Sequence, residues 1–307
     1  MMRWENRSSV TEFFLLGFSP EYPALQGVLF FLFFLAYVVT LQGNALLFLL
    51  TCLEPRLHTP MYFFLANLSF LDVCTSTTTV PRLLVDLLQP RQGISILSCF
   101  LQLFLVTALN TTELMLLTVM AYDRYVAVCC PLQYTMIMNR GMCINLATCS
   151  WVGGCLHSLI HTLLAARLPF CGSNQVNQFF CNAPQLLELS CADTTINEVA
   201  LLLTGVALSG FFPVILISYA RILAAVQRSR AAGERRGKAL STCASHLMVV
   251  VMFYGSAAAT CLAGRGGAGS VFYTAITPML NPIIYSLRNQ EVRGAWRKMT
   301  GRKGRVT

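Results

Sequence analysis

Residues 24–51 read ALQGVLFFLFFLAYVVTLQGNALLFLLT, a stretch without a single Asp, Glu, Lys or Arg. A helix needs about 20 apolar residues to cross the roughly 30 Å hydrocarbon core of a bilayer, because each residue advances it by about 1.5 Å. Backbone amides in lipid must form hydrogen bonds within their own segment, and a closed barrel would need shorter strands of alternating polarity. This stretch therefore predicts a transmembrane helix.

Six more stretches have the same character. Four lack charged residues, 142–166, 199–220, 239–263 and 268–287, and two contain one acid each, Asp72 in 59–81 and Glu113 in 94–122. Over the whole chain 11% of residues are charged and 55% hydrophobic, whereas about 25% are charged in soluble domains. This composition excludes an ordinary soluble globule, and its hydrophobicity excludes a disordered chain.

The sequence therefore predicts an all-α membrane protein with a bundle of seven transmembrane helices. It contains an N-terminal segment 1–23, a helix domain 24–288 and a basic tail 289–307 that could form a short amphipathic helix. We read the seven spans as one domain, because no long linker or repeat separates them.

The 22 basic residues lie unevenly along this bundle. Sixteen fall on one set of alternate loops and the tail, with dense runs at 221–238 and 288–305, and six fall on the other set. Because cytoplasmic loops carry the excess of Lys and Arg, we expect an extracellular N-terminus and a cytoplasmic C-terminus in a multi-pass plasma-membrane protein. Asn6 then lies in an outward-facing glycosylation sequon, and the basic runs face membrane lipid and not nucleic acid.

Four cysteines lie toward the predicted outer side. Cys171, Cys181 and Cys191 are in the loop after the fourth span, and Cys99 is at the outer end of the third. Two disulfides are expected on the oxidising side of a membrane, although spacing alone allows three pairings and free thiols are the alternative. A bridge from Cys99 to the loop would hold the loop as a lid over the bundle.

One face of the third span carries residues at helical spacing, which are Val106, Asn110, Glu113, Leu117, Ala121 and Arg124. This face must point inward, because an ionisable Glu113 is costly against lipid. Asp72 and Glu113, with Asn44 and Asn281 nearby, could share a proton or hold a cation such as sodium, or form a polar plug that only fixes helix packing. His157 and His161 are one turn apart, but packing is more plausible for them than metal binding.

Four strings carry a family resemblance. LHTPMYFFL (57–65), MAYDRYVAVC (120–129), KALSTCASH (238–246) and PMLNPIIY (278–285) resemble the signature strings of vertebrate olfactory receptors, which are rhodopsin-like G-protein-coupled receptors. The chain also resembles that family at single characteristic positions, which are Asn44, Asp72, Trp151 and Tyr219.

The resemblance implies the disulfides Cys99–Cys181 and Cys171–Cys191. It also implies a set of residues for activation and coupling to a heterotrimeric G protein, which are Asp123, Arg124, Tyr125, Tyr219, His246, Asn281, Pro282 and Tyr285. Among these, proline at 282 lacks an amide proton and should kink the seventh span into a hinge.

A ligand pocket is expected above Glu113 and beneath the lid. The third span offers Val106, Thr107, Asn110 and Thr111, and the resemblance adds Thr204, Ala207, Tyr254, Ala257, Ala258, Cys261, Val271 and Thr274. Val106 stands where amine receptors of the wider family carry an acid, so we expect a small neutral volatile odorant, hydrogen-bonded by Asn110. For any one of these residues taken alone, helix packing is a more plausible role than ligand contact.

The sequence thus predicts an odorant receptor that raises cyclic AMP through a stimulatory G protein, without a cofactor. A transporter would show paired broken helices, and an enzyme would need a nucleophile or metal beside Asp72 and Glu113. Two alternatives stay open. One is a receptor of this fold for a non-odorant small molecule. The other is a poorly signalling receptor, because the loop at Arg265–Gly269 is several residues shorter than the family pattern.

Overall fold

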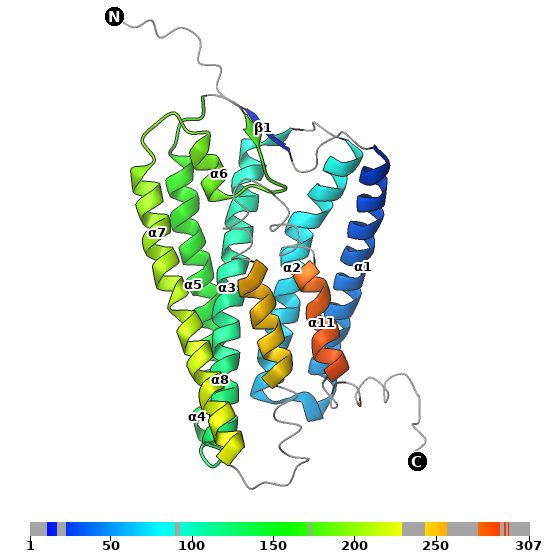
Figure 1. Ribbon diagram of the computed structural model, residues 1–307, viewed down its shortest axis with the longest axis vertical. Coiled ribbons are helices and arrows are strands. Elements are labelled where there is room, and N and C mark those ends of the chain that lie inside the picture. Colours follow the sequence, from blue (N-terminus) through cyan, green and yellow to red (C-terminus); the bar gives the residue numbers. More distant parts are fainter. Residues whose placement is uncertain are drawn as a thin grey trace, which may run out of the picture.

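A computed structural model of the chain describes residues 11–16, 23–89, 93–171, 174–228, 243–256, 276–288, 292 and 294. Long helices run side by side between two ends of the molecule (Figure 1). They are α1 (Pro23–Leu53), α2 (Pro60–Leu88), α3 (Ile96–Cys129), α5 (Arg140–Ala166), α7 (Thr195–Ser209), α8 (Phe211–Arg228), the helix Cys243–Ser256 and α11 (Thr277–Arg288). Shorter elements are the 3-10 helix η1 (Pro55–Leu57), α4 (Tyr134–Ile137) and α6 (Ala183–Glu188).

Four of these segments are long and apolar enough to cross a membrane on their own, Leu25–Leu53, Ile96–Cys129, Arg140–Ala166 and Thr195–Arg228. In three of them, all but Ile96–Cys129, the apolar side chains are widely exposed, including Phe31 at 72% and Leu202 at 66%. Such exposure is unfavourable in water but natural against lipid. Within the described residues the helices therefore follow the predicted spans, except at residues 94–95 and at Gly210.

The fifth predicted span differs from expectation, because it consists of two helices. The chain passes from α7 to α8 at Gly210, three residues before Pro213. Proline cannot donate an amide proton to the carbonyl group of Ser209 and its ring crowds that carbonyl. Hydropathy is uniform over 199–220 and does not reveal this break. Pro213 is the feature of the sequence that indicates it.

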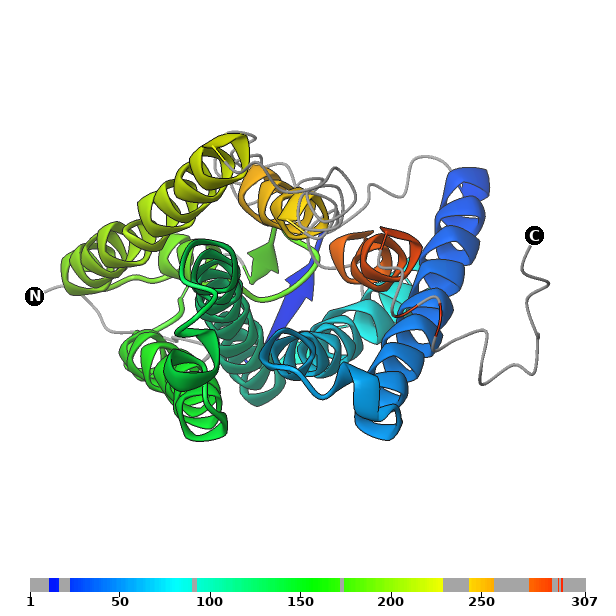
Figure 2. The same ribbon diagram turned by 90° about the horizontal axis from the view of Figure 1, so that it is seen from below.

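The third helix lies inside the bundle. It packs against α2, α5 and α8, and the end view shows α11 between α1 and the helix Cys243–Ser256 (Figure 2). Val106, Glu113, Leu117 and Ala121 are all buried to 97% or more. The predicted inward face of the third span is thus the inward face of α3.

Close contact between α3 and α5 depends on a glycine. A Cβ atom at Gly154 would lie 2.6 Å from the carbonyl oxygen of Ala108 and would also overlap Thr112 Oγ1. Beside it, Ser158 Oγ donates to the carbonyl oxygen of Phe104 at 2.6 Å. The two helix backbones therefore approach each other through small residues, as is common where helices pack within a membrane.

A small sheet covers one end of the bundle, which the all-α prediction did not include. The strand β1 (Glu12–Leu15) pairs antiparallel with β2 (Ile94–Ser95) and parallel with β3 (Gln175–Val176). Residues 94–95, expected to start the third span, belong to this sheet. Phe13 is fully buried and meets the ring of Phe170 edge-on at 5.3 Å. Burial of this ring explains why a short N-terminal segment is held in place.

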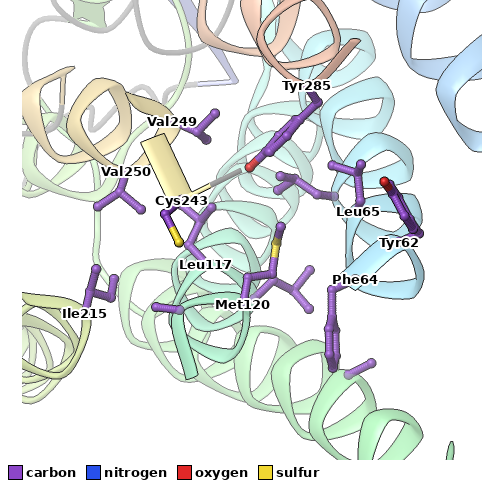
Figure 3. Packing of buried hydrophobic residues seen from close by; sticks show 14 of the residues in the cluster. Tyr62, Phe64, Leu65, Leu117, Met120, Ile215, Cys243, Val249, Val250 and Tyr285 are labelled. Atoms are coloured by element: carbon purple, nitrogen blue, oxygen red, sulfur yellow. The ribbon is translucent and has the colours of Figure 1, made fainter. Parts of the chain in front are cut away.

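The largest apolar core lies toward the opposite end. Figure 3 shows side chains converging from several helices, with the ring of Tyr285 pointing from α11 toward Leu117 and Cys243. Val292, predicted on the apolar face of the tail helix, is 1% exposed and belongs to this cluster. The rest of the tail, the outer part of the sixth span, the shortened loop and Asn6 lie outside the described residues.

Candidate functional site

Two disulfides secure the loop between α5 and α7. Cys99 at the start of α3 is bonded to Cys181, with Cα atoms 5.5 Å apart, and Cys171 to Cys191, with Cα atoms 5.9 Å apart. These are the pairings that the family resemblance implies. Cys99 and Cys181 are both fully buried, so the first bridge fixes the loop to the bundle axis.

Gln102 strengthens this attachment, a role that the sequence analysis did not predict. Its Nε2 donates to the carbonyl oxygen of Thr78 at 3.1 Å, and its Oε1 accepts from the backbone N–H of Cys181 at 3.0 Å. A single side chain, 5% exposed, thus joins α2, α3 and the loop. Its partners are 24 and 79 residues away in the chain, so local spacing could not reveal the link.

The loop fills the space above the predicted pocket. Phe179 and Phe180, directly before Cys181, form a buried apolar cluster with Val106 of α3 and Leu83 of α2. Val106 is 3% exposed. It therefore provides an apolar contact directly under the lid, at the position where a cation-binding receptor would need an acid.

Asn110 lies one turn below Val106 on the same face. Its Oδ1 is buried and has no hydrogen-bond partner within the part of the chain that the structure describes. A buried acceptor left without a partner costs about 1–3 kcal/mol. Asn110 is thus the residue in this region best able to gain from a ligand with a polar group.

Two other predicted pocket residues are engaged by histidines of α5. Thr111 Oγ1 and His157 Nδ1 are hydrogen-bonded at 2.9 Å, and Thr204 Oγ1 and His161 Nε2 at 3.0 Å. The Thr111 hydroxyl also donates to the carbonyl oxygen of Thr107 at 2.9 Å, so the imidazole must supply the proton of the other bond. The histidines therefore bond to threonines, and the described residues hold no group of three metal-binding side chains.

The remaining predicted pocket residues differ in burial and in whether the structure describes them. Tyr254 packs its ring on Phe212, with centroids 4.7 Å apart, and its buried hydroxyl has no partner among the described residues. Thr107 is half-buried on α3, but Ala207 is exposed on α7, so the structure lends no support to its place in the pocket wall. Five further predicted residues, Ala257, Ala258, Cys261, Val271 and Thr274, lie outside the described residues.

A polar core connects the helices below the pocket. Asn281 Nδ2 donates to both carboxylate oxygens of Asp72 at 3.0 Å, and Asn44 Nδ2 donates to the carbonyl oxygen of Pro278 at 3.0 Å. Asp72, Asn281 and Asn44 are each 1% exposed and Glu113 is 3% exposed. Three predicted core residues, from α1, α2 and α11, thus lie in one hydrogen-bonded region.

This core also contains oxygen atoms suited to a small cation. Ser69 Oγ, Asn44 Oδ1 and Asn281 Oδ1 are buried without a hydrogen-bond partner among the described residues. Oxygen ligands of this kind suit hard cations. The donor set fits the sodium alternative as well as the polar plug.

At the far end of α3, Arg124 is held by its neighbour. Its Nε donates to Asp123 Oδ2 at 2.9 Å, and a second guanidinium nitrogen contacts the same oxygen. The other carboxylate oxygen accepts from the hydroxyl of Tyr134 in α4 at 2.8 Å. Asp123 is fully buried, so both partners satisfy a desolvated carboxylate,. Tyr134 was not among the predicted residues.

Other predicted activation residues gather around Arg124. Tyr219 of α8 and His246 are hydrogen-bonded, with stacked rings whose centroids are 5.8 Å apart. A cavity of about 10 Å³ has Arg124, His246 and Tyr285 among its lining residues, a size that accommodates roughly one water molecule. These groups can therefore change hydrogen-bond partners without repacking the core.

Two predictions in this region concern the seventh helix and Tyr125. Pro282 lies inside α11, and its ring is 3.0 Å from the place of a Cβ atom at Gly43, so α1 approaches α11 closely at the expected hinge. Tyr125 is half-buried, and its ring centroid is 6.5 Å from that of Tyr122.

Similar proteins cover nearly the whole chain. A family model described as "Olfactory receptor" matches residues 33–303. The chain is 46% identical over 310 residues to Olfactory receptor 2H2 of Homo sapiens, which covers 98% of this chain and 99% of that protein. It is 46% identical over 310 residues to Olfactory receptor 1M1 of Mus musculus, covering 98% of each. It is 48% identical over 303 residues to Olfactory receptor 1f45 of Rattus norvegicus, covering 96% of each.

Proposed function

Because the chain belongs to the olfactory receptor family, we propose that it binds a small neutral volatile beneath the disulfide-bonded lid and activates a stimulatory G protein. Members of this family are seven-helix signalling receptors of the plasma membrane, and not enzymes. The proposal adds the chemistry of the ligand, the side on which it binds and the second messenger, cyclic AMP.

The choice of a neutral ligand is supported by the wall around Val106. The lid residues Phe179 and Phe180 and the helix residue Leu83 enclose it in apolar contacts. A site of this composition, with few polar groups, suits small organic molecules. An ammonium ion placed there would lose its hydration without gaining a counter-ion.

The observation that carries the proposal is the buried carbonyl oxygen of Asn110, which has no hydrogen-bond partner among the residues that the structure describes. It lies one turn below Val106, so a ligand in contact with Val106 can reach it. An alcohol would donate a hydrogen bond to this oxygen, whereas an aldehyde, ketone or ester would accept one from the side-chain amide. The single amide thus orients several classes of weakly polar volatile.

The lid side is proposed as extracellular, with a cytoplasmic C-terminus. Disulfides form in oxidising compartments, and both bridges lie at the end of the molecule that carries β1 (Figure 1). Arg124 and α4 lie at the opposite end (Figure 1). This arrangement agrees with the excess of basic residues on the loops at that end.

The experiment expresses the full chain with an N-terminal epitope in cells that report cyclic AMP. A panel of alcohols, aldehydes, ketones and esters is compared with primary amines. Antibody binding to intact cells measures the surface amount of each variant and reports the orientation of the N-terminus. The proposal of a neutral ligand is contradicted if amines activate the receptor and no neutral volatile does.

The role of Asn110 is tested with the best neutral agonist. Asn110→Leu keeps the approximate size of the side chain but removes its polar atoms, and we expect the half-maximal concentration to rise about three- to tenfold. Thr118→Val is the control, because Thr118 is buried on the same helix and its hydroxyl donates to the backbone carbonyl oxygen of Leu114, one turn earlier in that helix. Equal effects of the two substitutions would contradict the proposed contact.

A further inference from the structure

A groove opens at the end of the bundle opposite the lid, away from the odorant site and the core around Arg124. Its volume is about 550 Å³. Its wall is formed by the end of α1, by η1 and the start of α2, and by the start of α5 with Met138 before it. The groove therefore lies where two helices begin and one ends.

The exposed polar residues of the groove lie just before or at the start of two helices, whereas Thr51 and Tyr62 of its lining are buried. His58 and Thr59 precede α2, and Arg140 is the first residue of α5. All three are exposed. Arg140 has no carboxylate within ion-pair distance among the residues that the structure describes. Arg140 thus brings a cation with five donor groups to the groove, and no described acid is paired with it,.

The inner part of the groove is apolar. Phe63 and Ala66 lie one and two turns into α2, and Cys143 and Ile144 lie one turn into α5. Seven residues from Thr59 to Ala66 correspond to about 10 Å along the helix axis. Phe63 is 38% exposed and Ile144 45% exposed. The wall therefore presents accessible hydrocarbon beside the polar residues, on the same two helices.

The acids at this end do not oppose an anion in the groove. Asp123 is fully buried and occupied by Arg124 and Tyr134, and Glu54 is 9% exposed. Neither lines the groove. Within the described residues the groove therefore has a net positive character.

We propose that this groove binds an anionic phospholipid, with its headgroup at Arg140, His58 and Thr59 and an acyl chain against Phe63, Ala66 and Ile144. Basic pockets between helices on the cytoplasmic side suit anionic headgroups, which are concentrated in that leaflet. An isolated anion would not use the apolar wall, and a neutral lipid would not use the arginine. The assignment to the cytoplasmic leaflet rests on the proposed orientation of the chain.

The test uses purified full-length receptor in nanodiscs of mixed phosphatidylserine and phosphatidylcholine, without odorant. One of the two lipids carries a photoreactive acyl chain, and labelled peptides are identified by mass spectrometry. We expect phosphatidylserine to label residues 59–66 and 140–144 in preference to phosphatidylcholine. Both leaflets of a nanodisc contain both lipids, so the result depends neither on orientation nor on odorant response.

Three variants separate a built site from general attraction to a charged surface. Arg140→Gln should lower labelling of these peptides by phosphatidylserine about fivefold, and leave that by phosphatidylcholine unchanged. Arg56→Gln, which removes an equally exposed cation of η1 that does not line the groove, should have no effect. Ile144→Trp should fill the groove and lower labelling by both lipids.

The proposal is overturned if both lipids label the wild-type groove equally, which would mean that the acyl chain alone is recognised. It is also overturned if Arg56→Gln lowers labelling as much as Arg140→Gln does, or if Ile144→Trp leaves labelling unchanged. Because Arg140, Arg56 and Ile144 are exposed, none of these substitutions should prevent folding.

Discussion

The tyrosine at 134 shows how one hydroxyl can restrain the buried pair at the end of α3. It occupies the carboxylate oxygen of Asp123 that Arg124 leaves free. Burial and the neighbouring Asp123 raise the pKa of Tyr134. Its hydroxyl therefore remains protonated and able to donate throughout the physiological pH range.

Tyr134→Phe should raise basal signalling. A hydrogen bond to a charged group contributes about 1.5–3 kcal/mol, so its loss should favour release of Arg124 by roughly tenfold or more if the bond exists only in the resting state. Basal cyclic AMP, normalised to surface expression, is the measurement. Tyr122→Phe is the control, because Tyr122 is 40% exposed on α3, the helix that carries Asp123 and Arg124. A lower basal signal in Tyr134→Phe would mean that the hydroxyl supports the active state.

For single residues, the sequence predicted burial where a polar side chain interrupts an apolar run. Asp72, Glu113 and Asn281 are polar groups inside apolar runs, and each is buried in the bundle. Gln102 and Tyr134 escaped notice because polar residues near helix ends are ordinary. Their roles come from partners that only the folded chain brings together.

Among the helices, contact between α3 and α5 provides a sharp test of the packing. Gly154→Ala places a methyl group against the backbone oxygen of Ala108 and Thr112 Oγ1, where little can yield. Overpacking of this kind costs about 1–3 kcal/mol. We expect a lower thermal unfolding temperature in detergent and less receptor at the cell surface.

Gly205→Ala is the matched control, since a Cβ atom there meets nothing within 4 Å. Alanine in place of glycine stiffens the unfolded chain and favours a helix. Gly205→Ala should therefore unfold at the same temperature as the wild type or slightly higher. Equal losses in the two variants would show that α3 and α5 do not approach as closely as described.

The helices also show what hydropathy can and cannot predict. Apolar length located each span, because the requirement to cross a bilayer applies to every residue in it. It could not predict the division at Gly210, where the covalent structure of Pro213 decides. Hydropathy also could not predict β1, because the strands that pair with it lie far along the chain.

Across the whole molecule the two disulfides should differ in importance. The Cys99–Cys181 bridge closes 82 residues and Cys171–Cys191 closes 20. A longer closed loop removes more freedom from the unfolded chain, here by about 1 kcal/mol more in the chain-entropy account. The first bridge also anchors the lid to α3, so its loss should disturb the pocket.

We therefore expect the double variant Cys99→Ser with Cys181→Ser to unfold at a lower temperature than Cys171→Ser with Cys191→Ser. It should also lose more response to the neutral agonist at equal surface expression. Thermal unfolding in detergent and the cyclic AMP assay provide the two measurements. The reverse order would assign the structural role to the bridge within the loop.

The strand β1 carries a consequence for biosynthesis. Its partners β2 and β3 follow it by about eighty and one hundred and sixty positions, so at the ribosome β1 emerges long before either can receive it. With the proposed orientation of the chain, the aromatic ring of Phe13 stays unshielded in the secretory lumen until the fourth span has been inserted and the segment that contains β3 has been delivered. The sheet of β1, β2 and β3 therefore forms only when synthesis of the chain is well advanced. Before then the N-terminal segment exposes an apolar side chain, which chaperones of that compartment can recognise.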